Sequence, residues 1–261
     1  MVNRMRTTVR RVLSLFAVLL LAGTAGLLAG CDDRQPSPPP AQAGNPTPTG
    51  PVYRSGKPNG LEKRPAREIL AKALAATRGA TSLRITGTYR SGGQTFDLDM
   101  RYDATGARGE HRLSEGESLR IVRIQNEVWL RAGERFWRDI VGARSFRDKY
   151  LRFPADDPRY AGVVDLTYPD RLIPKLIAVG PRDPLVKGEI KVVNGVRAVE
   201  VVDRASRRGG SIWVALQGPP YVVRVEAGVG SRASGSVDFF DYGAPVKLTA
   251  PDPRQVVELT G

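Results

Sequence analysis

The spacing of apolar residues changes once along this chain, from a helical period to a period of two. Between residues 65 and 78, apolar side chains recur every three or four positions. Pro65 begins this segment, Glu68 lies in its first turn and Gly79 follows it. Proline at the start, an acid in the first turn and glycine after the end are typical limits of a helix. The pattern therefore predicts one amphipathic helix over residues 65–78.

After this helix, apolar and polar residues alternate in a series of short segments. Phe96, Leu98 and Met100, for example, alternate with Thr95, Asp97 and Asp99. Strict alternation predicts strands with one buried face, and short gaps such as Asn194-Gly195 predict hairpin turns. We expect about a dozen antiparallel strands, over residues 82–90, 95–102, 107–113, 119–124, 127–132, 135–139, 187–193, 196–203, 210–216, 221–227, 234–242 and 245–249.

The segment 142–184 breaks this alternation. It contains six prolines, which favour loops and short helical turns, and Pro174 limits the one amphipathic stretch there to short pieces. A last short turn is expected after Asp252-Pro253. A sheet with one apolar face must cover that face, and only the 65–78 helix and this middle segment can do so. The pattern thus predicts an α+β fold.

The first thirty residues have the order of a secretory signal. Four arginines and no acid stand in residues 1–11, and residues 12–28 carry no charge. The apolar run is also long enough for an uncleaved membrane helix. Residues 31–64 follow as the N-terminus of the mature chain and a proline-rich tether. Residues 32–60 contain too few apolar residues to fold, and in an extended polyproline conformation they could reach about 90 Å. The folded domain is expected over 65–261.

The tetrapeptide Leu28-Ala29-Gly30-Cys31 resembles a bacterial lipobox, and Cys31 is the only cysteine of the chain. The resemblance implies cleavage before Cys31 and attachment of diacylglycerol and palmitate to it. A cysteine that merely follows an apolar helix is the alternative. More than one acyl chain gives stable anchoring, so the resemblance implies an extracytoplasmic protein held at the cell membrane by its lipidated N-terminus.

Two further stretches carry a resemblance to a family: residues 188–202 (GEIKVVNGVRAVEVV) and residues 239–251 (FFDYGAPVKLTAP). With the lipobox, their order is similar to that of the actinobacterial LprG/LppX-like lipoproteins, which have the LolA/LolB-type carrier fold. The resemblance implies a curved, open antiparallel sheet, a half-barrel, with the N-terminal helix and short middle helices over its concave face. It implies no shared catalytic residues, since some members bind lipids or glycolipids in the concavity.

Two functions follow from this comparison. In the first, the concavity binds or carries a lipid or glycolipid. In the second, side chains of the protein fill the concavity, and a non-enzymatic envelope lipoprotein acts through a protein partner as a sensor, chaperone or scaffold. An apolar cavity of several hundred Å³ would favour the first. The expected ligand-lining residues, chosen by strand parity, are Leu83, Ile85, Phe96, Leu98, Met100, Ile121, Val128, Leu130, Phe136, Ile212, Val214 and Leu216.

Composition excludes several other chemistries. One cysteine and one histidine among 261 residues exclude an intramolecular disulfide and a Cys/His zinc site. We therefore expect no enzyme, cofactor or metal. His111 shares its parity with Ala107 and Leu113, which favours a hydrogen-bonded structural role, and Asp156-Asp157 is read as a turn and helix cap instead of a catalytic pair.

The net charge of +13 leaves two interpretations open. Anionic headgroups or wall polymers would be attracted to such a chain, whereas nucleic acid is not expected outside a cell. A solvated basic surface without a specific partner explains the charge equally well. Trp129 and Trp137 are out of step with their apolar neighbours, so they are placed either at the outer surface or mouth, or in the core against the helix.

Overall fold

A single sheet of twelve strands forms the body of the protein. The computed structural model describes residues 56–258, apart from short stretches at 92–93, 114–115, 142–145, 147, 178, 206–208 and 228–233. The expected signal segment, Cys31 and most of the tether lie outside the described residues. The order of the strands in the sheet is β12-β6-β5-β4-β3-β2-β1-β11-β10-β9-β8-β7.

The first half of the sheet is a meander in which each strand pairs with the next. Its strands are β1 (Ser82–Ser91), β2 (Gln94–Asp103), β3 (Gly106–Leu113), β4 (Ser118–Ile124), β5 (Glu127–Ala132) and β6 (Tyr150–Pro154). The second meander contains β7 (Leu185–Val193), β8 (Val196–Asp203), β9 (Gly210–Ala215), β10 (Val222–Ala227) and β11 (Ser234–Phe240). Antiparallel pairing of β1 with β11 joins the two meanders into one sheet.

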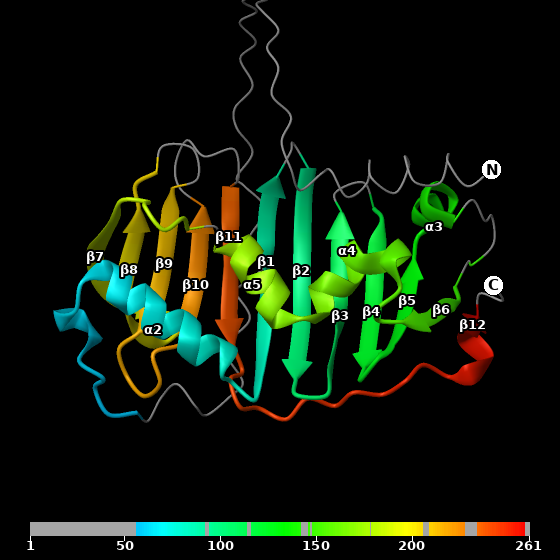
Figure 1. Cartoon of the computed structure of the whole chain (residues 1–261), viewed down its shortest axis with the longest axis horizontal. Coiled ribbons are helices and arrows are strands. Elements are labelled where there is room, and N and C mark those ends of the chain that lie inside the picture. The colour runs from blue at the N-terminus through cyan, green and yellow to red at the C-terminus, as the bar shows by residue number, and fades with distance from the viewer. Residues whose placement is uncertain are drawn as a thin grey trace, which may run out of the picture.

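The helices lie together on one face of this sheet (Figure 1). They are α2 (Ala66–Arg78), α3 (Glu134–Val141), α4 (Ala161–Val164) and α5 (Pro169–Leu176), with the short 3₁₀ turns η3 (Leu61–Lys63), η4 (Pro158–Tyr160), η5 (Asp165–Thr167) and η6 (Pro253–Gln255). The α+β fold with an open sheet, an N-terminal helix and short middle helices on one face is confirmed. In the described part of the chain, no helix is both long and apolar enough to cross a membrane.

Three strand predictions were wrong. Residues 135–139 belong to helix α3. Phe136 and Trp137 are adjacent, so they lie near one another on a helix but would point to opposite faces of a strand. Strand β6 was missed, since only Leu151 and Phe153 alternate in a segment dominated by prolines. Residues 245–249 form no strand and run along the ends of the strands (Figure 1).

The C-terminal end also differs from the expected turn. The turn η6 is present after Asp252, whose side chain accepts a hydrogen bond from the backbone of Arg254. It is followed by β12 (Val256–Glu258), which pairs with β6 in parallel. The sheet is therefore mixed at this edge and antiparallel elsewhere.

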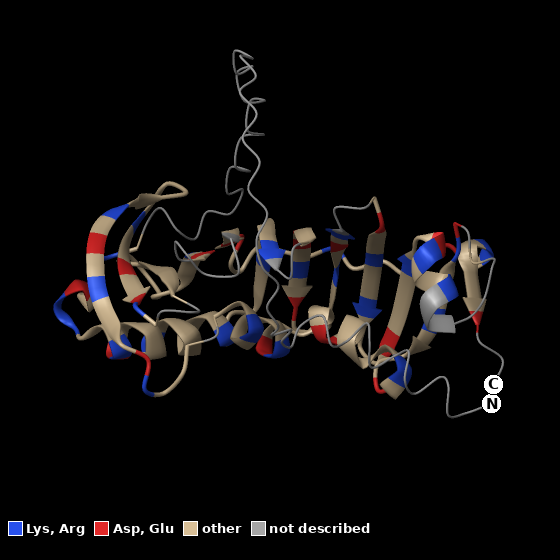
Figure 2. Ribbon diagram, turned by 90° about the horizontal axis from the view of Figure 1, so that it is seen from above, with Lys and Arg blue, Asp and Glu red and all other residues tan. Residues whose placement is uncertain are grey.

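The sheet curls strongly at the end that carries β7, on the left in Figures 1 and 2. Asn194, in the turn between β7 and β8, donates a hydrogen bond of 2.7 Å to Asp238 on β11. Three strand spacings separate β8 from β11, about 14 Å in a flat sheet, so the β7–β8 hairpin folds back over the outer face. Trp213 is buried beneath it, with Lys191 Nζ 4.0 Å above its ring.

Arg224 completes this closure. Its Nε donates to Asp238 Oδ1 at 2.6 Å and its Nη2 donates to Asn194 Oδ1 at 3.0 Å. The Asp238 side chain is 5% exposed and that of Arg224 is 17% exposed. Asp238 thus neutralises a largely desolvated arginine at short distance and holds the hairpin turn, while Glu226 adds a longer contact of 3.5 Å to Arg224 Nη1.

We expect Asp238→Ala to lower the free energy of unfolding by about 2 kcal/mol, because it removes the buried partner of Arg224 at 2.6 Å and leaves only the more exposed Glu226 at 3.5 Å. Asp97→Ala is the matched control, since Asp97 accepts only an exposed hydrogen bond from Thr88 on the same outer face. Urea unfolding of both variants measures the difference. Equal losses in the two variants would contradict this role of Asp238.

Candidate functional site

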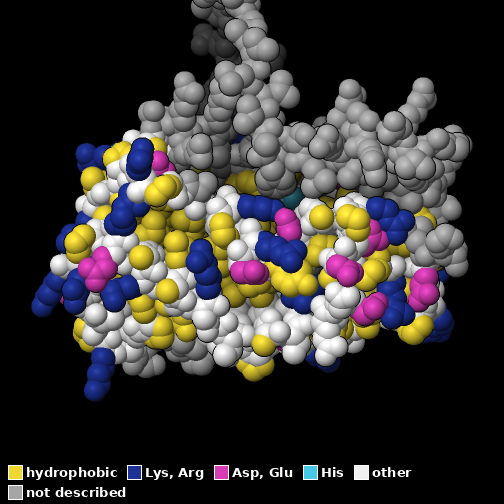
Figure 3. Space-filling model, in the orientation of Figure 1, with side chains coloured by type: hydrophobic (Ala, Val, Ile, Leu, Met, Phe, Trp, Pro, Cys, Tyr) yellow, Lys and Arg dark blue, Asp and Glu magenta, His cyan; other side chains and the backbone are white. Residues whose placement is uncertain are grey.

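The cover of the sheet has two parts, and it leaves apolar surface between them. Helix α2 packs against β7, β8, β9 and β10, whereas η5 contacts β3 and β4. Figure 3 shows apolar side chains gathered on this face over the region between α2 and α5. The elements that border this region carry the half-buried Leu74, Leu176 and Val225, and we call these three residues the apolar patch.

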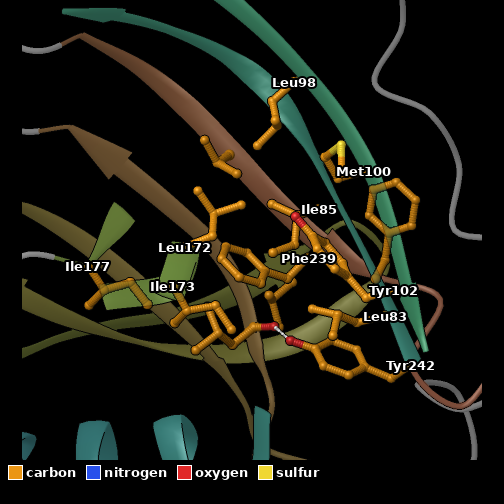
Figure 4. Packing of buried hydrophobic residues seen from close by; sticks show 14 of the residues in the cluster. Leu83, Ile85, Leu98, Met100, Tyr102, Leu172, Ile173, Ile177, Phe239 and Tyr242 are labelled. Carbon is orange, nitrogen blue, oxygen red and sulfur yellow. Dashed lines mark hydrogen bonds between the residues drawn. The ribbon is translucent and has the colours of Figure 1, made fainter. Parts of the chain in front are cut away.

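Under the cover lies an apolar layer that contains most of the predicted ligand-lining residues. Leu83, Ile85, Leu98 and Met100 lie under α5, where Leu172, Ile173 and Ile177 face the sheet (Figure 4). Ile121, Val128, Leu130, Ile212, Val214 and Leu216 belong to the same buried cluster. Phe96 is buried as well but packs in an aromatic group described below, and Phe136 is partly buried on α3.

These buried side chains contact protein, not a void. Apart from Phe136, each predicted lining residue is at most 9% exposed, and Ile85, Met100 and Val214 are at 0%. A side chain that lined a ligand-sized cavity would instead keep surface free of contact with protein atoms. In this arrangement the cover therefore occupies the surface that a ligand would need.

Arg123 is a functional candidate that the alternation of inner and outer positions along β4 could have found, but it was not among the residues predicted from the sequence. It shares the inner face with Leu119 and Ile121, and it is 7% exposed. Its Nε donates to Thr167 Oγ1 at 3.1 Å, its Nη2 to Thr167 O at 3.2 Å and its Nη1 to Gln125 O at 2.9 Å. The guanidinium also lies 4.0 Å from the centre of the Tyr168 ring. Burial lowers the pKa of Arg123.

A second hydrogen bond ties the same turn to the sheet. Tyr102 Oη on β2 donates to the carbonyl oxygen of Leu166 at 2.8 Å. We call Arg123, Thr167, Tyr102 and Leu166 the η5 latch. It attaches η5 to β2 and β4 by polar contacts, whereas α5 contributes apolar side chains to the layer.

His111 lies in an aromatic group on the inner face. Its ring stacks on Phe96 with 5.4 Å between ring centres, and its Nε2 is 3.2 Å from Tyr89 Oη. Burial lowers the pKa of His111 to about 4, although Asp97 opposes the shift. The ring is neutral near pH 7 and hydrogen-bonded, in line with the structural role that the sequence favours.

The other candidates also have structural surroundings. Asp157 caps η4 by accepting a hydrogen bond from the backbone of Arg159, and the Arg159 side chain lowers its pKa. The cap predicted for Asp156-Asp157 is thus confirmed at Asp157. Trp137 is buried between Phe136 and Phe146, while Trp129 is partly buried on the outer face beside Arg152.

Comparison with known proteins gives distant structural similarity alone. No protein-family model and no curated protein matches this chain. The lipoprotein LppX of Mycobacterium tuberculosis is 15% identical, with a TM-score of 0.46 over 70% of this chain and 98% of that one. An uncharacterised conserved protein of Thermus thermophilus is 14% identical, with a TM-score of 0.38 over 74% and 98% of the two chains.

A DUF1329 family protein of Desulfovibrio piger is 8% identical, with a TM-score of 0.25 over 70% of this chain and 95% of that one. LppX is a member of the group that the sequence of this chain resembles. At these identities the comparison concerns the fold, so the assignment of function below depends on the geometry of this chain.

The buried histidine makes stability depend on pH. Its pKa of about 4 lies below the ordinary 6.5, so the unfolded chain takes up this proton first as the pH falls. The contribution of neutral His111 to the free energy of unfolding is therefore complete above pH 6.5. It is lost as the pH falls to about 4, which lowers the free energy of unfolding by up to about 3 kcal/mol. We expect His111→Phe to flatten this part of the pH profile. Urea unfolding between about pH 7 and about pH 4.5 measures it, and parallel profiles for the two proteins would contradict the expectation.

Proposed function

We propose that this chain binds a long apolar molecule, such as the acyl chain of a lipid or glycolipid, on the helix-bearing face of its sheet. The observation that carries the proposal is that the apolar face is wider than its two-part cover. Leu74 on α2, Leu176 on α5 and Val225 on β10, the residues of the apolar patch, are only partly buried. Figure 3 shows apolar side chains at the surface of this face between α2 and α5, and apolar surface gathered in this way marks binding sites.

The cover itself offers a route from the patch into the apolar layer. Helix α5 has eight residues and contains Pro174, and helices this short have little stability on their own. Its order therefore depends on packing against the sheet. A ligand that displaces Leu172 and Ile173 would bury the same apolar surface of the sheet. Burial of apolar surface contributes about 25 cal/mol per Å², whether a helix or a ligand covers it. The predicted lining residues under α5 would then contact the ligand, while the η5 latch retains the cover.

A second function is favoured by the burial of those same residues. Where the protein's own side chains fill the concavity, a non-enzymatic envelope lipoprotein acts through a protein partner, and the apolar patch is then the contact surface. The two functions differ in one measurable property, which is saturable binding of a free apolar molecule.

Val225→Trp tests the first function. Val225 pairs with Ile212 and Val237 and is only half-buried, so an indole there covers the patch without filling the core. Val214 would be a poor choice, because it is fully buried and a larger side chain would destabilise the fold. We expect Val225→Trp to weaken binding of a fluorescent long-chain fatty acid by about tenfold.

The matched control for this experiment is Val122→Trp. Val122 is also half-buried, but it lies on the outer face between Arg108 and Trp129. It should bind the fatty acid like the unmodified protein. Absence of saturable binding by the unmodified protein, or equal weakening by both variants, would reject the lipid function and favour the protein partner.

We also propose that the mature chain begins at Cys31 and is anchored to the extracytoplasmic side of the cell membrane through lipid on that residue. The lipobox resemblance supports this proposal. Mass spectrometry of the native protein should find a lipid-modified Cys31 at the N-terminus, and Cys31→Ala should release the protein while fatty-acid binding is unchanged. Residues 1–30 intact on most of the material would contradict it.

A further inference from the structure

Three arginines form a row on the outer face of the sheet. Arg84 on β1 is directly opposite Arg101 on β2, and Arg101 is directly opposite Arg108 on β3. Opposed residues on neighbouring strands point to the same face about 5 Å apart, where like charges are destabilising. The row therefore needs negative charge to balance it.

The protein supplies only part of that charge. Asp99 is bound by Arg84 through both oxygens, with Nε to Oδ1 at 2.8 Å and Nη2 to Oδ2 at 2.7 Å. Arg101 reaches the same carboxylate only at 3.4 Å. Among the described residues, no carboxylate lies within ion-pair distance of Arg108, which is exposed. Arg101 and Arg108 thus keep hydrogen-bond donors that Asp99 does not use.

A pocket of about 150 Å³ opens beside this row. Leu83, Arg84 and Arg101 form one wall, and the segment from Asp241 to Val246 forms the other. Asp241 adopts a left-handed backbone conformation with φ of 55°, which turns the chain from β11 into this wall. Asp241 also attracts Arg84 electrostatically. The charged residues of the pocket walls are thus Arg84, Arg101 and Asp241, and Lys247 follows the segment immediately.

We propose that a phosphate group binds at the edge of this pocket, between Arg101 and Arg108 on the outer face, with Arg84 held in position by Asp99. The planar guanidinium group donates paired hydrogen bonds that match the oxygens of a phosphate. The phosphate belongs either to a phospholipid headgroup or to a soluble phosphate ester, and the two share this chemistry.

The first experiment titrates inorganic phosphate into the full chain in a non-ionic detergent at constant ionic strength. Side-chain Nε–H signals of arginine and the backbone amides of Ala244 and Val246 are followed by NMR. We expect saturable shifts, with binding weakened about tenfold by Arg101→Gln and by Arg108→Gln. Arg112→Gln removes the same charge from the same strand and face, and should change affinity less than twofold, a difference of under about 0.4 kcal/mol.

Two outcomes would overturn the proposal. One is a shift that stays linear in phosphate, and the other is equal weakening by Arg112→Gln, which would indicate surface charge alone. Arg108→Gln keeps the test valid even where Arg101→Gln unfolds the chain, because Arg108 is exposed.

The second experiment identifies the source of the phosphate. Vesicles of phosphatidylglycerol and of phosphatidylcholine are compared for binding of the unmodified protein, Arg108→Gln and Arg112→Gln. Binding that only Arg108→Gln weakens, and that inorganic phosphate displaces, assigns the site to a lipid headgroup. Saturable phosphate binding without such vesicle binding assigns it to a soluble ester. Fatty-acid binding on the opposite face should be unchanged in each variant, so this proposal and the lipid function fail separately.

Discussion

The continuous apolar face of the sheet is the constraint on which the rest of this structure depends. Strands β1–β11 contribute inner side chains to one cluster, and the helices available to cover it are short. A cover made of separate pieces must be fixed to the sheet at chosen points. Arg123 on β4 is such a point. Its buried guanidinium donates two hydrogen bonds to Thr167 in η5 and one to the carbonyl oxygen of Gln125, in the turn after β4. The desolvation cost of that charge is offset only while η5 stays in place.

Folding and binding use the same surface in this arrangement. Val214 and Met100 are fully buried because α2 and the α5 segment occupy the space above the strands. A ligand must therefore compete with part of the cover, and the weakest part is the eight-residue α5 with Pro174 inside it. Helix α2, in contrast, has thirteen residues and is tied to the sheet through Thr77, which accepts a hydrogen bond from the backbone of Val222. The α2 part of the cover is therefore held to the sheet more firmly than the α5 part.

Sequence alternation predicted the strands that have one apolar and one polar face, and it failed where that signal is short. Strand β6 has only two inward apolar residues, Leu151 and Phe153, and adjacent Phe136 and Trp137 are compatible with a helix. The pairing of β1 with β11 and the contact between Asn194 and Asp238 join residues distant along the chain, which local patterns do not encode. All predicted lining residues except Phe136 are buried, but strand parity does not reveal whether a ligand or a helix covers them.

The outer face is governed by charge, and its arginines are not equivalent. Arg84 has a structural role, since Asp99 binds it through two oxygens and its side chain is 14% exposed. Arg108 makes no comparable contact in the described part of the chain and lies opposite Arg101, so its charge opposes folding. A bound anion would remove this repulsion, which no carboxylate of the described residues balances at ion-pair distance from Arg108. Because the sheet separates Arg101 and Arg108 from the apolar face, an anion on the outer side and an apolar molecule on the inner side can bind independently.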